Sequence, residues 1–173
     1  MTTRSRVVLR TATALDAKKL HALIAANVEE GRLLPRSLPE LTARAPRFVV
    51  AVRARTIVGC AELAPLSAQL AEVRSLAVDA GERGRHIGTT LVDELRRRAG
   101  RGGFEQLCAF THAPSYFINM GFSIVPHSWL LEKVLTDCVG CSNFRTCGQV
   151  AMVVPTEPAR ESHEQPAAMP RYA

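Results

Sequence analysis

The chain has 173 residues, of which 47% are hydrophobic and 22% charged, with a formal net charge of +6. This composition is that of one globular domain with a substantial core, and no apolar run reaches the roughly 20 residues that cross a membrane. The start "MTTRSRVVLRTA" lacks the apolar core of a secretion signal, so we expect a cytoplasmic protein.

The first half of the chain predicts a strand, a helix and three successive strands. "RVVLRTAT" (6–13) is a strand, and apolar residues at 3.6-residue spacing then predict a helix from a cap at Asp16 to a stop at Gly31. "LLPRSLPEL" (33–41) contains two prolines and is expected to be a loop or a short helical turn. The next three strands are expected at 47–52, 56–63 and 71–78.

The second half alternates helices with strands and ends in an aperiodic tail. Helices are expected at 88–99, 115–122 and 128–135, and strands at 105–110, 122–125 and 149–154. This order predicts a single α/β domain over residues 1–154, built on a mixed sheet with helices on its faces and carrying a cysteine-bearing insertion at about 136–148. The polar tail at 155–173 is expected to be disordered.

Positive charge gathers in two places, at Arg83 and Arg85 and along residues 96–101. Few aromatic residues accompany these clusters, so the stacking platform of a nucleic-acid-binding protein is missing, and the second cluster fits a solvated helix face. We expect a small-molecule ligand or a phosphorylated cofactor, and no nucleic acid or membrane as partner. The sequence leaves a homodimer open.

The stretch "ERGRHIGTT" joins the strand at 71–78 to the following helix. The first N–H groups of a helix lack backbone partners and carry the positive end of the helix dipole. A glycine-containing turn in front of such a helix lets those groups converge on a phosphate. Arg83 and Arg85 add formal charge at the same place, so the stretch suits a pyrophosphate, although an ordinary strand–loop–helix junction can hold the same residues.

The wider stretch "EVRSLAVDAGERGRHIGTTLVDEL" resembles the acetyl-coenzyme A motif of the GNAT superfamily of N-acetyltransferases. Arg83 and Gly88 match the outer positions of Arg/Gln-x-x-Gly-x-Gly/Ala, and His86 replaces the middle glycine. An ordinary helical backbone at His86 would keep its N–H directed at the phosphate. "SYFINMGF" is similar to the later Tyr-x-x-x-Gly-Phe segment of the family.

The resemblance implies the GNAT fold, a mixed and mostly antiparallel central sheet with flanking helices and a splayed pair of strands that binds acetyl-CoA. It assigns the pantetheine arm to the backbone of the strand and the pyrophosphate to the loop and helix start. The implied cofactor-binding residues are Leu76, Ala77, Val78, Arg83, Gly84, Arg85, His86, Ile87, Gly88 and Thr89.

The superfamily reaction is direct transfer of an acetyl group from a thioester to an amine. Glu72, at the start of the cofactor strand, is the candidate base, with a solvated strand-end carboxylate as the alternative interpretation. The usual tyrosine of the family falls at Phe117, and Tyr116 is displaced by one residue, which turns a helical side chain by about 100°. Tyr116 is the candidate acid, although a thiol leaves readily as an anion and needs none.

A narrower resemblance concerns the acceptor, because "EEGRLLPRSLPEL" is similar to a segment of the N-acetylglutamate synthases. Glutamate carries two carboxylates, and arginine forks bind carboxylates bidentately. Arg36 and Arg74 are therefore the candidate anchors, with Ser37 and His112 as supporting donors; each arginine could also be an ordinary surface residue.

These patterns predict acetylation of the α-amino group of L-glutamate, the first step of arginine biosynthesis. Two alternatives stay open. One is an acetyltransferase for another amine, such as glutamine, another amino acid, a polyamine or a protein N-terminus. The other is a non-catalytic acetyl-CoA sensor.

Three cysteines, Cys138, Cys141 and Cys147, lie close together in "DCVGCSNFRTCG". Thiolates at this spacing can hold a structural zinc ion, with Cys108, His127 or Asp137 as fourth ligand. Free thiols packed in a loop, or a disulfide or redox role, are the other interpretations. Cys60 and Cys108 fall in predicted strands and are expected in the core.

Overall fold

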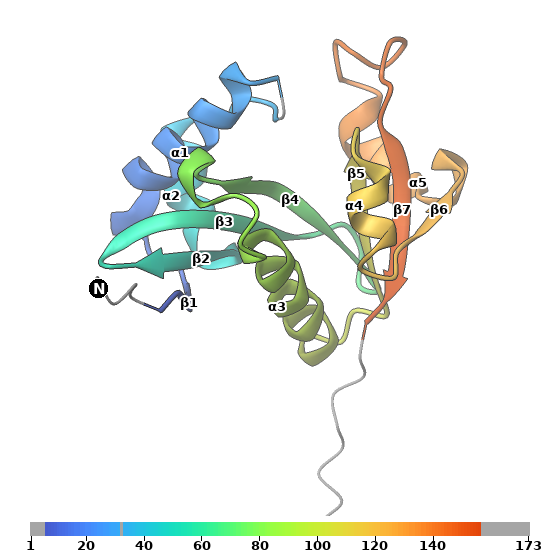
Figure 1. Cartoon of the computed structure of the whole chain (residues 1–173). Helices are drawn as coiled ribbons and strands as arrows, with labels where there is room; N and C mark the ends of the chain where they lie inside the picture. The colour runs from blue at the N-terminus through green and yellow to red at the C-terminus, as the bar shows by residue number, and fades with distance from the viewer. Residues whose placement is uncertain (1–5, 32, 157–173) are drawn as a thin grey trace, which may run out of the picture.

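The computed structural model describes residues 6–31 and 33–156, and its elements follow the predicted order (Figure 1). The strands are β1 (Val8–Thr11), β2 (Phe48–Arg53), β3 (Thr56–Pro65), β4 (Leu70–Val78), β5 (Gln106–Thr111), β6 (Ser123–Val125) and β7 (Val150–Pro155). The α-helices are α1 (Ala17–Glu29), α2 (Leu38–Arg44), α3 (Ile87–Arg101), α4 (Pro114–Ile118) and α5 (Leu131–Lys133).

The strands form one seven-stranded sheet in the order β1-β2-β3-β4-β5-β7-β6. Each neighbouring pair is antiparallel except β4 and β5, which run parallel. This arrangement confirms the mixed, mostly antiparallel sheet expected from the sequence. Helix α3 supplies the crossover that a parallel pair requires.

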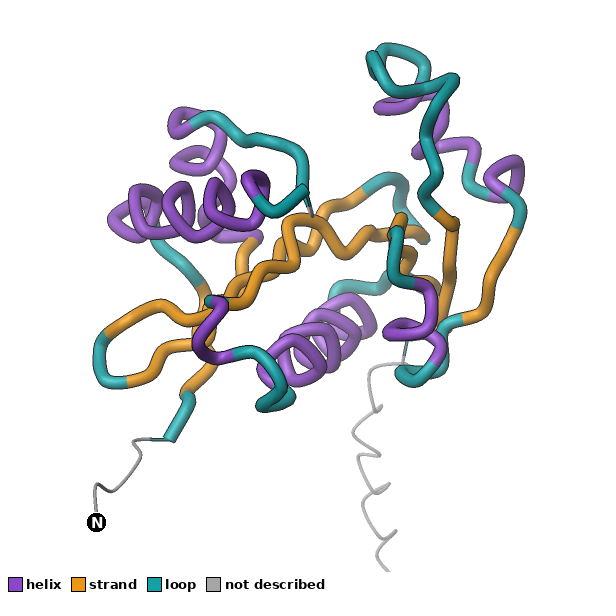
Figure 2. Tube along the Cα trace, turned by 45° about the horizontal axis from the view of Figure 1, so that its top comes forward, coloured by secondary structure: helices purple, strands orange, loops and turns teal. Residues whose placement is uncertain are grey.

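Helices cover both faces of the sheet, with α1 and α3 on opposite sides (Figure 2). The apolar stripe of α3, including Leu91 and Leu95, packs on one face against Val49 and Ala61. On the other face, Leu20 and Ile24 of α1 join Leu41 of α2 and Phe48 in a second cluster. These buried side chains supply the hydrophobic free energy that holds the helices to the sheet.

Several boundaries differ from the predicted ones. The helix expected at 115–122 ends at Ile118. The helix expected at 128–135 is a 3-10 turn at His127–Trp129, the single turn α5 and a π-helical turn at Val134–Cys138, because few apolar residues of this segment find a core to pack on. The ordered chain also runs past Pro155, since the N–H of Thr156 donates to the C=O of Glu105 at 3.0 Å. The rest of the predicted tail, 157–173, lies outside the described residues.

Among the residues that the structure describes, no helix is both long enough and apolar enough to cross a bilayer.

Candidate active site

The parallel strands β4 and β5 pair only at their beginnings. The register ends with Leu70 opposite Gln106, Ala71 opposite Leu107 and Glu72 opposite Cys108, after which the two strands diverge (Figure 1). On the other side of β4, the pairing with β3 shifts register between Cys60 and Glu62, and Ser75 has a φ of +50°. This irregularity has the character of a β-bulge, which bends and twists a strand. The splay expected at 76–78 is therefore present.

The start of α3 lies beside this opening. Its first helical hydrogen bond runs from the N–H of Thr90 to the C=O of His86 at 2.9 Å, so the N–H groups of Ile87, Gly88 and Thr89 have no partner inside the helix. Such converging donors at the positive end of a helix dipole suit a phosphate. The structure thus fits the predicted pyrophosphate contact.

His86 departs from the expected conformation. Its φ of +59° and ψ of 14° place it in the left-handed region, where a side chain with a Cβ costs about 1–2 kcal/mol and glycine costs little. The condition under which the His86 N–H would stay directed at the phosphate, an ordinary helical backbone, is therefore not met. The conformation also gives a physical reason for the glycine that the family motif has at this position.

The two arginines of the loop are bound within the protein. Arg83 reaches back to the end of α1, where its guanidinium pairs with Glu30 at 2.8 Å and donates to Asn27 Oδ1 at 3.2 Å. Arg85 pairs with Glu82 at 3.2 Å, and Glu82 also binds Arg53 on β2. These side chains fix the loop to the body of the domain, so the backbone is the part of the loop that is presented to a ligand.

Tyr116 of α4 stands directly against Gly88. A Cβ built on Gly88 would lie 2.6 Å from the Tyr116 hydroxyl oxygen, so the close approach of α4 to the start of α3 requires glycine. The hydroxyl is buried beside the Thr89 side chain, but no well-formed hydrogen bond joins it to another of the described residues. Burial raises the pKa of Tyr116, so the phenol stays protonated at neutral pH and is available as a donor.

This contact predicts that Gly88→Ala weakens acetyl-CoA binding by about 10–100-fold, since overpacking of 1–3 kcal/mol displaces the N–H groups of the helix start. Adding Tyr116→Phe to Gly88→Ala is expected to restore most of the affinity, because the next Tyr116 atom lies 3.6 Å from the added Cβ. Titration calorimetry measures both. Gly140→Ala is the matched control, since a Cβ there meets no atom within 4 Å. Unchanged affinity in Gly88→Ala would contradict the prediction.

Charged side chains line the face of β3 and β4 that is opposite to α3, beside α2. Glu62 of β3 is fully buried, and its Oε2 accepts a hydrogen bond from Arg36 Nη2 at 2.9 Å. Arg36 lies between α1 and α2, and it also donates to Ser75 Oγ at 3.0 Å and pairs with Glu40 at 3.0 Å. The predicted anchor Arg36 is therefore directed at the sheet, next to the bulge of β4.

A second charged cluster continues along β4. Arg74 lies opposite Glu62 across the strand pair and binds both Glu72 and Asp137. Lys133 pairs with Glu72 at 2.8 Å and with Asp137 at 3.0 Å. Glu72, the candidate base, is thus buried and held by two cations, in contrast to the solvated carboxylate of the alternative interpretation.

The site includes three residues that the sequence did not single out as part of it. Glu62 is a lone acid in the apolar run "TIVGCAEL", and such a residue needs a buried partner, which is a usable signal. Lys133 lies four residues before Asp137, a spacing at which helical side chains meet. Ser75 carried no signal, because its role depends on the bulge.

Two of the predicted supporting donors lie elsewhere. Ser37 Oγ accepts a hydrogen bond from the N–H of Glu40 at 3.3 Å and caps α2. His112 is exposed and lies near Gly148 in the cysteine-bearing connection. Neither side chain joins the charged face of β4 in this structure.

The cysteine cluster does not form the expected metal site. All five cysteines are free thiols, and Cys60 and Cys108 are buried in the core as predicted. Among the described residues, no three histidine, cysteine or acidic side chains are arranged to hold a metal ion. Cys138 ends the π-helical turn, Cys141 and Cys147 follow in the connection to β7, and only Cys147 of the three is exposed. The zinc expectation is thus not supported.

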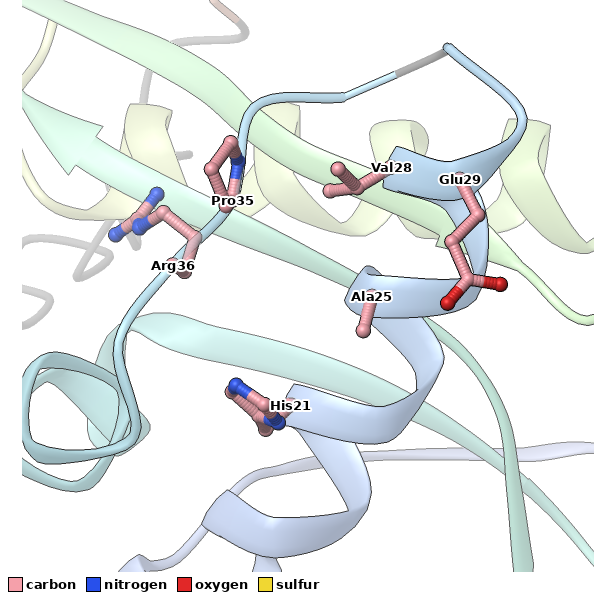
Figure 3. A pocket seen from close by; sticks show the side chains of 6 residues that line it. All are labelled: His21, Ala25, Val28, Glu29, Pro35 and Arg36. Atoms are coloured by element: carbon pink, nitrogen blue, oxygen red, sulfur yellow. The ribbon is translucent and has the colours of Figure 1, made fainter.

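A small hollow of about 170 Å³ adjoins Arg36, between α1 and the segment that precedes α2. Figure 3 shows that the Arg36 guanidinium points away from α1, toward the sheet. The walls of the hollow are His21, Ala25, Val28, Glu29 and Pro35. Arg36 is the only residue of the charged cluster that lines the hollow. The hollow therefore lies at the border of the site.

Comparisons with known proteins agree with this geometry. Over 145 residues the chain is 28% identical to an uncharacterised N-acetyltransferase of Chlorobaculum tepidum, covering 84% of this chain and 94% of that protein. It is 30% identical over 96 residues to an amino-acid acetyltransferase of Vibrio vulnificus, covering 54% of this chain but only 22% of the relative.

Among solved structures, N-acetylglutamate synthase from Neisseria gonorrhoeae, complexed with coenzyme A and N-acetyl-glutamate, superposes with a TM-score of 0.76 at 22% identity. The match covers 90% of this chain and 36% of that one. This likeness concerns the fold, and the chain spans only about a third of the length of that synthase.

The splayed parallel pair, the exposed amides at the start of α3 and the buried charges beside them are the features of an N-acetyltransferase that uses acetyl-CoA as donor. Residues 44–124 match the family model described as an acetyltransferase (GNAT) domain. Over these residues the chain therefore matches a GNAT acetyltransferase domain.

Proposed function

We propose that the chain transfers the acetyl group of acetyl-CoA to the α-amino group of L-glutamate, which is the first step of arginine biosynthesis. The observation that carries this proposal is the gathering of Arg36, Arg74 and Lys133 on one face of β3 and β4, beside the opening of the sheet. An acceptor with two carboxylates needs at least two cationic anchors, and arginine is well suited to the task.

The donor would be held on the side of the opening that faces α3. The N–H groups of Ile87, Gly88 and Thr89 would bind its pyrophosphate, and the edge of β4 from Leu76 to Val78, which does not pair with β5, would hold its pantetheine arm; the C=O of Val78 already accepts from Arg83 Nε at 3.2 Å. When bound, acetyl-CoA supplies an activated acetyl group with a thiolate as leaving group.

The amine must lose a proton before it attacks, and Glu72 is the proposed base. Its Oε2 is bound by Arg74 and Lys133, while Oε1 accepts from Lys133. A carboxylate oxygen has two lone pairs, so Oε1 retains one for the amine or for an intervening water. On the other side of the opening, the protonated Tyr116 is the proposed donor to the leaving thiolate.

The relatives support the acceptor class. The amino-acid acetyltransferase of Vibrio vulnificus is similar over 96 residues, and the gonococcal synthase shares the fold. Because this chain spans a minor part of each, the choice of glutamate rests on the arrangement of charges described above.

The test is a measurement of thiol release from acetyl-CoA with glutamate, aspartate, glutamine, a polyamine and a peptide with a free N-terminus. Turnover with glutamate well above that with glutamine is the expected result, since glutamine lacks one charged group. Turnover only with the other amines would overturn the acceptor, and acetyl-CoA binding without turnover of any amine would favour a sensor. Calorimetry with acetyl-CoA makes that last outcome recognisable.

A further inference from the structure

Asp137 holds a position that the reaction as proposed leaves unexplained. It lies in the π-helical turn that follows α5, within the connection between β6 and β7. Its carboxylate binds Nη2 of Arg74 and lies 3.0 Å from Nζ of Lys133. The same two cations are anchors of the proposed acceptor site, so the protein's own carboxylate already occupies them.

The two acids that share these cations differ in how firmly they are held. Glu72 is a β4 residue inside the sheet, with a side chain only 4% exposed. The Asp137 side chain is 33% exposed, and the connection that carries it is loosely packed, with Leu131, Leu135 and Val139 facing solvent. A rotation of the Asp137 side chain would release both cations while Lys133, on the same connection, stays in place, whereas releasing Glu72 would require the sheet itself to move.

The cluster is balanced in charge while Asp137 is in place. Arg74 and Lys133 face two carboxylates, those of Glu72 and Asp137. Hydrogen bonds from Lys133 and Arg74 lower the pKa of Asp137, although burial acts in the opposite direction. An incoming carboxylate therefore finds no uncompensated cation in this cluster until Asp137 leaves.

We propose that Asp137 is an intramolecular occupant of the acceptor-carboxylate subsite, and that the acceptor binds Arg74 and Lys133 by displacing it. This inference rests on the proposed function, because it takes the acceptor to be an amino acid with a carboxylate. Asp137 then sets specificity. An amine without a carboxylate cannot displace it. For an acidic acceptor, the free energy needed to displace Asp137 is subtracted from the free energy of binding.

The experiment compares Asp137→Asn and Asp137→Ser with the unchanged protein, with Glu132→Gln, an exposed acid on the same segment, as the matched control. The KM for glutamate is expected to fall about 10–100-fold in both Asp137 variants, the scale of a lost charge-assisted competitor. A merely structural role for Asp137 predicts the opposite sign, a raised KM. A KM that is unchanged or raised in both variants overturns the inference.

Binding of glutarate, a dicarboxylate without an amine, separates this inference from the proposed function. Calorimetry in the presence of coenzyme A is expected to show tighter glutarate binding to Asp137→Asn than to the unchanged protein. If glutamate is not turned over but glutarate binding still tightens, the proposed reaction fails and the carboxylate subsite stands. If glutarate affinity is equal in the two proteins, the inference about Asp137 fails.

Discussion

Replacing Glu72 with glutamine is expected to lower kcat by about 10²–10⁴-fold, the usual contribution of a positioned general base. Glutamine keeps an oxygen that accepts from Arg74 and Lys133 but takes up no proton from the amine. Acetyl-CoA affinity is expected to be unchanged, because the donor contacts lie at Ile87–Thr89 and along the edge of β4. Steady-state kinetics and calorimetry measure the two effects.

The division of the effect between kcat and KM distinguishes two roles for Glu72. A base loses kcat, whereas a residue that only positions Lys133 and Arg74 would show a raised acceptor KM with kcat intact. Glu105→Gln is the control, because Glu105 is exposed at the start of β5. Retention of full kcat in Glu72→Gln would rule out the assignment of the base.

Replacing Arg36 with alanine is expected to reduce the free energy of unfolding by about 3–5 kcal/mol, the cost of removing the hydrogen-bonded partner of a buried charge; the Arg44 guanidinium, 3.9 Å from Glu62 Oε1, would be the remaining ion pair. Glu62 is fully buried, and of its two oxygens only Oε2 has a hydrogen bond, the one from Arg36. In a protein of this size, such a loss lowers the Tm by about 6–20 °C. Thermal and urea unfolding measure it.

The double variant Arg36→Met with Glu62→Leu tests the cause. Removing both charges leaves apolar side chains of similar volume, and such exchanges are often neutral or stabilising, so most of the lost stability should return. If the double variant is as unstable as Arg36→Ala, packing and not charge explains the loss. Acceptor KM values of Arg36→Ala are meaningful only well below its transition temperature.

The sequence predicted the parts of the molecule that depend on local pattern. Runs rich in β-branched and apolar residues predicted the strands, the 3.6-residue spacing predicted α1 and α3, and the motif around Gly88 predicted the loop that is proposed to bind the donor. Each of these signals lies within one continuous segment, where side-chain periodicity and glycine positions are informative.

The acceptor side could not be predicted in the same way. Arg74 was predicted as an anchor, but its partner Asp137 lies 63 positions further along the chain, and only the topology brings them together. Asp137 itself was considered as a zinc ligand, since its neighbours are cysteines. The left-handed backbone of His86 was missed because its side chain gives no sign of the conformation that the loop imposes.

The divergence of β4 from β5 separates the proposed donor site from the proposed acceptor site. In the proposed function, the donor is bound by the main chain of one continuous segment, 76–89, whereas the acceptor is bound by side chains of β4, of the linker between α1 and α2, and of the β6–β7 connection. Under that proposal, exchanging the β6–β7 connection or the linker between α1 and α2 would change the contacts to the amine while leaving Glu72 and Arg74 of β4, and the residues assigned to coenzyme A, in place.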